Sequence, residues 1–115
     1  MRKADATFDV LGSEWRLFIG DSAEFPYLED MDGYTDKTER FIVVSKPGED
    51  CQLADYQWYQ KKIIRHEVIH AFLFESGLAQ NSFQTDAWAQ NEEMIDWFSF
   101  NAPKIYRAFV DTDCL

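Results

Sequence analysis

The chain has 115 residues, 46% of them hydrophobic and 17% aromatic, which is enough for one globular domain around a single core. Its 11 basic and 21 acidic residues give a net charge of −10, which argues against a protein that binds nucleic acid through the phosphates. No run of about 18 apolar residues is present and the charged N-terminus leads into no apolar segment, so we expect neither a membrane span nor a secretory signal. Cys51 and Cys114 lie far apart without metal-site spacing, and we expect two reduced thiols in a cytoplasmic protein.

The first part of the chain is typical of β-strands. Residues 6–11 and 14–20 are short β-favouring runs joined at Gly12-Ser13, a pair that suits a hairpin turn. Residues 40–45 are apolar, rich in β-branched side chains and followed by Pro47, which predicts a central third strand. Between them, residues 21–36 carry six acidic side chains. They lack the spacing and terminal glutamate of an EF-hand, so we expect a solvated acidic loop and not a calcium site.

The second part of the chain is typical of helices. Residues 53–76 contain no proline or glycine and are followed by Gly77, a common helix stop. Residues 78–90 read as a polar connection. Asn91 is a good N-cap for a helix that reaches Pro103, which either kinks it or begins a separate last helix over 104–110.

These elements predict an α+β fold in one domain spanning residues 1–115. A three-stranded, mainly antiparallel sheet from the first 45 residues packs on the long helix, and one or two C-terminal helices follow.

The long helix contains the motif HExxH, formed by His66, Glu67 and His70, and these are the only two histidines of the chain. Residues four apart share one helical face, so both imidazoles can bind one zinc ion. The glutamate between them can take a proton from a zinc-bound water, as in helical metalloproteases. The alternative is a solvated histidine pair on an ordinary helix, with Glu67 in surface salt bridges.

A catalytic zinc ion needs a third protein ligand, and no third histidine exists. Glu92 and Asp96 lie four apart on one helical face, so Glu92 is the candidate ligand and Asp96 the carboxylate that orients His66 through its free ring nitrogen. Glu93 is the rival ligand, about 100° further around the helix. Acidic residues at a helix start also have a simpler role, because they complement the helix dipole.

HExxH followed after some twenty residues by NExxxD resembles the gluzincin pattern of thermolysin-like peptidases. The chain is far shorter than those enzymes and is similar instead to minimal zincins, namely short phage and prophage putative metallopeptidases and the ImmA/IrrE-type peptidases. The similarity covers roughly the second half of the chain. It implies His66, His70 and Glu92 as zinc ligands, Glu67 as catalytic base and Asp96 behind the ligands. It also implies, by analogy, a specific regulatory protein as the substrate.

The expected activity is therefore zinc-dependent hydrolysis of a peptide bond in a peptide or protein substrate, with Glu67 moving the proton. No histidine remains to stabilise the oxyanion, and Tyr106 and Arg107 of the last helix are the candidates for that role. The alternative from another class is a non-catalytic interaction protein of a phage or mobile element that keeps zinc on a zincin scaffold. A glutamate between the histidines favours the enzyme, because a structural zinc site has no need of it.

Overall fold

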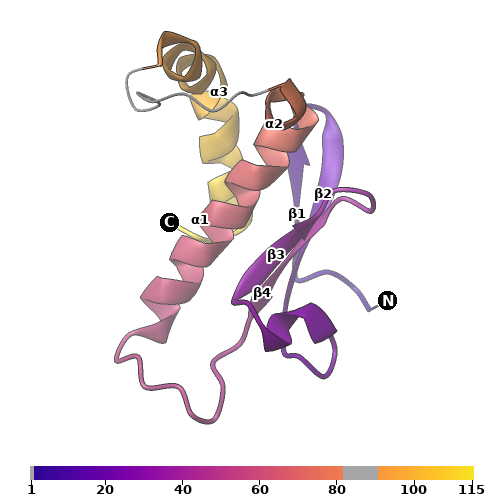
Figure 1. The fold of residues 1–115 in the computed structure, drawn as a ribbon, viewed down its shortest axis with the longest axis vertical. Helices are drawn as coiled ribbons and strands as arrows, with labels where there is room; N and C mark the ends of the chain where they lie inside the picture. Colours follow the sequence, from indigo (N-terminus) through magenta and orange to yellow (C-terminus); the bar gives the residue numbers. More distant parts are fainter. Residues whose placement is uncertain (1, 82–90) are drawn as a thin grey trace.

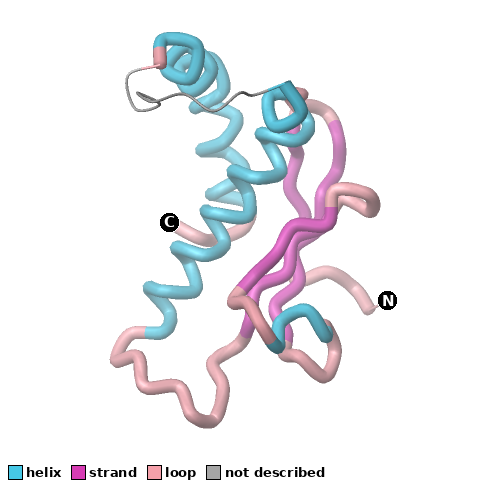
Figure 2. Tube along the Cα trace, in the orientation of Figure 1, coloured by secondary structure: helices cyan, strands magenta, loops and turns pink. Residues whose placement is uncertain are grey.

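The computed structural model describes residues 2–81 and 91–115. Figures 1 and 2 show helices α1 and α3 on one side of a small, twisted β-sheet. The strands are β1 (Ala6–Val10), β2 (Ser13–Gly20), β3 (Gly33–Asp36) and β4 (Phe41–Ser45). The helices are the 3-10 turn η1 (Pro26–Glu29), α1 (Tyr56–Glu75), α2 (Leu78–Asn81) and α3 (Glu92–Asp111).

The sheet has four strands in the order β1-β2-β4-β3 and is mixed. β1 pairs antiparallel with β2, and β3 pairs antiparallel with β4, while β2 and β4 run parallel. The prediction of a three-stranded, mainly antiparallel sheet was therefore wrong, although the α+β class holds. The β1–β2 turn lies at Leu11 and Gly12, one residue earlier than predicted. Both have positive φ, at 54° and 96°, as tight hairpin turns require.

The missed strand is β3, which lies inside the acidic stretch 21–36 that we expected to be a loop. Its sequence, Gly-Tyr-Thr-Asp, has neither β-branched alternation nor an apolar run, so no local pattern marks it. β3 forms because β4 offers it a full row of backbone partners, from Gly33 opposite Val44 to Asp36 opposite Phe41. The chain after β2 passes through η1 to the sheet edge and turns back, and β4 then fills the gap beside β2 in parallel.

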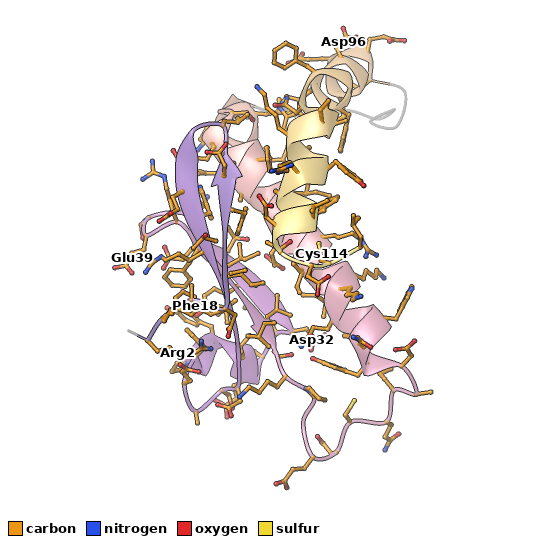
Figure 3. All side chains as sticks on the ribbon, turned by 180° about the vertical axis from the view of Figure 1, so that it is seen from behind. Arg2, Phe18, Asp32, Glu39, Asp96 and Cys114 are labelled. Atoms are coloured by element: carbon orange, nitrogen blue, oxygen red, sulfur yellow. The ribbon has the colours of Figure 1, made fainter. Side chains whose placement is uncertain are left out.

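Two apolar clusters lie on opposite faces of the sheet. The larger one joins the sheet to α1 and α3 and contains Trp15, Leu17, Ile42, Val68 and Phe72. The smaller one is covered by the segment around η1. Its buried members are Phe18, Phe25, Leu28, Phe41 and Val43. Figure 3 shows Phe18 in this second layer with Arg2 beside it, and the Arg2 guanidinium lies 5.4 Å from the Phe18 ring centre.

Helix α1 is fixed to the sheet at both ends. At its start, the Tyr56 hydroxyl donates to the Ser45 carbonyl at 2.6 Å. At its last residue, the Glu75 carboxylate accepts hydrogen bonds from Trp15 Nε1 at 2.9 Å and Arg40 Nε at 2.5 Å. The helix therefore runs along the sheet in a defined register, which sets where its histidines lie.

Helix α3 begins as predicted, with the Asn91 side chain accepting from the Met94 amide at 2.8 Å. It continues through Pro103, so the last helix is one element and not two. The predicted polar connection 78–90 begins with the short helix α2, and its residues 82–90 lie outside the described part of the chain.

Two further expectations concern membrane-spanning segments and the cysteines. Across residues 2–81 and 91–115, no helix combines the length and apolar character that crossing a bilayer requires. Cys51 is exposed and Cys114 is buried, and both are free thiols as expected.

Candidate metal centre

The two histidines of HExxH lie together on the outer face of α1. Both side chains are exposed, and their Nε2 atoms are 3.1 Å apart. The ring centroids are 4.8 Å apart, with the rings inclined at 71°. Two imidazole nitrogens thus converge on one point at the surface, with solvent access on the far side.

Glu67 turns away from the histidines' outer face toward the sheet. It is only 6% exposed. Its Oε1 atom accepts a hydrogen bond of 2.8 Å from the hydroxyl of Thr35 in the middle of β3. Thr35 is a site residue that sequence reasoning missed, because the strand that carries it has no recognisable pattern.

Gly33 lets β3 and α1 approach closely enough for this contact. A Cβ atom at Gly33 would lie 2.8 Å from Ile63 Cγ2, 3.0 Å from the Val43 carbonyl oxygen and 3.3 Å from Glu67 Oε2. The first distance is shorter than real Cβ contacts and the other two are tight, so a side chain at this position would require Ile63 or the neighbouring backbone to shift. The glycine that we considered as part of an acidic loop therefore serves helix–strand packing.

A pocket of about 220 Å³ opens beside the motif, between α1, β3 and α2. Glu67 and His70 line it together, so the buried carboxylate and one imidazole face the same space. Its remaining lining residues are Thr35, Lys37, Phe74 and Ala79.

The downstream carboxylates lie in the first turns of α3, which starts near the end of α1, where Trp97 Nε1 donates to Ser76 Oγ at 3.1 Å. Residues two apart on a helix point about 200° apart, so Arg65 lies roughly opposite Glu67. Arg65 donates to the Cys114 carbonyl at 2.7 Å, which places the chain beyond α3 on the Arg65 flank, while β3 occupies the Glu67 flank. Glu92 and Asp96 are exposed, and Figure 3 shows Asp96 at the far end of the molecule from Asp32.

Within the described ranges, no three His, Cys, Asp or Glu side chains gather into a group that could hold a metal ion. The structure therefore places the His66 and His70 imidazoles together, with the Glu67 carboxylate turned toward β3, and it does not bring Glu92 or Asp96 to them. Residues 82–90, which directly precede α3, are outside the description. The assignment of Glu92 over Glu93 as third ligand stays a prediction.

The proposed oxyanion stabilisers are also on α3. Tyr106 is 60% exposed, and Arg107 lies 3.7 Å from Asp111 on the same helix. Neither lines the pocket beside Glu67. The cation that does line it is Lys37, in the turn after β3, which sequence reasoning did not single out.

The described site thus consists of two converging imidazoles, a buried carboxylate held by Thr35, and an adjoining pocket with one lysine. Comparisons of this chain with models of known protein families, with curated proteins and with solved structures found no match.

Proposed function

We propose that this protein is a zinc-dependent metallopeptidase. The observation that carries the proposal is the environment of Glu67. A buried carboxylate is costly unless it is paired with a cation, and among the described residues Glu67 has a single neutral donor, the Thr35 hydroxyl. Glu67 lies between the two histidines in sequence and lines a pocket beside them. A buried carboxylate has a use there, because a proton acceptor next to a metal must be near the substrate and shielded from bulk water.

The histidine pair fits zinc. Two zinc–nitrogen bonds of about 2.05 Å at a tetrahedral angle separate the nitrogens by about 3.3 Å. The observed separation of 3.1 Å is close to that value, so little movement is needed to form the chelate. Zinc, when bound, supplies a Lewis acid that polarises a peptide carbonyl and lowers the pKa of a water molecule.

The chain's own residues then have separate roles. His66 and His70 hold the metal on the exposed face of α1. Glu67 accepts a proton from the attacking water and passes it to the leaving amine. Thr35 keeps the carboxylate turned into the pocket, where it meets the substrate. A carboxylate from α3, Glu92 in our assignment, completes the ligand set.

The proposal extends to the partner and the compartment. The proposed substrate is a peptide or protein, which would reach the exposed histidines and the adjoining pocket lined by His70 from the surface. The two free thiols, one of them exposed, suit the reducing conditions of the cytoplasm, which is where we propose that the protein works.

The test combines metal analysis with cleavage of a proteome-derived peptide library, read by mass spectrometry. We expect one zinc per chain, loss of zinc in His66→Ala, and zinc without cleavage in Glu67→Gln, because an amide cannot accept the water proton. Full zinc in His66→Ala, or equal cleavage by wild type and Glu67→Gln, would contradict the proposal. Zinc without cleavage by the wild type would favour the non-catalytic interaction protein.

A further inference from the structure

Lys37 is the one side chain of fixed positive charge in the lining of the pocket that Glu67 and His70 share. It lies in the turn between β3 and β4, about thirty residues before the motif. Its Nζ atom is 5.7 Å from the centre of the Phe74 ring, and Phe74 lines the same pocket. A cation over an aromatic face is attracted to it, so the ring holds the ammonium at the pocket wall.

The turn that carries Lys37 is itself well fixed. Asp36 Oδ1 accepts hydrogen bonds from the Thr38 hydroxyl at 2.7 Å, the Thr38 amide at 2.9 Å and the Glu39 amide at 3.1 Å. The Thr38 hydroxyl, followed by these backbone donors, holds the pKa of Asp36 below its ordinary value. The Asp36 carboxylate, next to Lys37 in sequence, is thus hydrogen-bonded within the turn. Within the described residues, Lys37 forms no ion pair.

The pocket lining combines one fixed positive charge, Lys37, with the Glu67 carboxylate, so it is less acidic than the molecule as a whole. The chain carries −10 overall. The larger groove beside η1, of about 500 Å³, is lined by Asp21, Glu29, Asp32 and Asp50 against one lysine. The acidic lining of this groove disfavours a negatively charged group. The pocket beside Glu67, called here the Lys37 pocket, instead offers a lysine that forms no ion pair among the described residues.

We propose that the Lys37 pocket binds a carboxylate of the substrate next to the scissile bond. The carboxylate belongs either to the C-terminus of a peptide or to a glutamate or aspartate side chain. Phe74 and Ala79 supply the apolar wall for the methylene groups beside it. This inference rests on the proposed function, and it names the class of substrate that the site selects.

The test is an NMR titration of ¹⁵N-labelled protein, both metal-free and zinc-loaded, with three matched compounds. N-acetylglutamate α-amide has only the side-chain carboxylate, N-acetylglutamine has only the terminal one, and N-acetylglutamine α-amide has neither. We expect at least one carboxylate compound to bind at the pocket roughly three- to tenfold more tightly than the neutral one, an advantage that falls as salt rises. The compound that shows the advantage identifies the source of the carboxylate.

Variants assign the effect to Lys37. We expect Lys37→Gln to abolish the advantage and Lys37→Arg to keep it. Lys104→Gln is the matched control, since Lys104 lies over the Phe100 ring at 5.2 Å on α3 but does not line the pocket. No advantage in the wild type, or one that Lys37→Gln retains, would overturn the inference. A failure to bind zinc would count against the proposed function alone, because the metal-free titration tests Lys37 without it.

Discussion

At the scale of single residues, Glu67 is a buried carboxylate whose lost hydration is poorly compensated by the protein. Burying a carboxylate costs several kcal/mol before compensation, while a hydrogen bond to a charged group returns about 1.5–3 kcal/mol. Among residues 2–81 and 91–115, Glu67 accepts one such bond, from Thr35. An apolar residue in its place would leave no carboxylate to desolvate, which agrees with a residue kept for chemistry.

Thr35 is expected to act as a positioning residue for Glu67. Thr35→Val keeps the shape but removes the donor, so kcat for library cleavage should fall by about tenfold or more, while zinc content and KM stay near wild type. Thr35→Ser retains the hydroxyl and should restore most of the rate. Equal kcat values for the valine and serine variants would show that the hydroxyl has no part in positioning Glu67.

At the scale of elements, the position of α1 on the sheet depends on its two ends. Glu75 joins its last turn to Trp15 at the start of β2 and to Arg40 before β4. Burial by itself raises the pKa of Glu75, but the hydrogen bond and charge of Arg40, together with the Trp15 donor, outweigh it and leave this pKa below its ordinary value. The ionised carboxylate is therefore the form that the folded state favours.

A carboxylate whose pKa is lowered by folding stabilises the protein above its ordinary pKa, and that stability is lost as the pH falls through the folded-state value. We expect Glu75→Gln to lower the free energy of unfolding by about 1 kcal/mol at pH 7. The difference from wild type should shrink toward pH 3. Denaturant titrations across this range measure it. Glu39→Gln, at an exposed carboxylate in the turn before Arg40, is the control and should leave the free energy of unfolding at pH 7 near the wild-type value.

At the scale of the whole molecule, completing the metal centre depends on how α3 meets α1. The end of the chain is tied to the middle of α1, where Lys61 donates to the Leu115 carbonyl at 3.2 Å and Arg65 to that of Cys114. The start of α3 is near the other end of α1, where Trp97 Nε1 donates to Ser76 Oγ at 3.1 Å. The acidic first turn of α3 therefore lies beyond the histidines along α1.

Our assignment makes three acidic residues of α3 unequal in their effect on zinc. Glu92→Ala should weaken zinc affinity most, and Asp96→Ala should weaken it by roughly 10–100-fold through loss of the partner of His66. Glu93→Ala should leave it unchanged, since that side chain points about 100° away. Competition with a chromogenic chelator gives the three affinities. A larger loss in Glu93→Ala than in Glu92→Ala would exchange the two roles.

The sequence by itself determined the features that depend on neighbours along the chain. The four-residue spacing of His66 and His70 places both imidazoles on one face of a helix. The absence of proline and glycine from residues 53–76 predicts that helix, which the structure has as α1. Asn91 marks the start of α3 for an equally local reason. In β2, Trp15, Leu17 and Ile19 point to one face of the sheet, and Phe18 points to the other. The apolar Phe18 on a face otherwise expected to be polar indicates the second apolar cluster.

Only the tertiary structure decided what meets the motif. Gly33 and Thr35 of β3, and Lys37 in the turn after it, reach Glu67 and its pocket from about thirty residues earlier in the chain. β3 itself forms by pairing with β4. The parallel pairing of β2 with β4 likewise follows from the path of the chain through η1, and no local pattern of apolar and polar residues predicts that path. Contacts between distant segments depend on packing and on the partners that backbone groups find, so they became visible only in the folded chain.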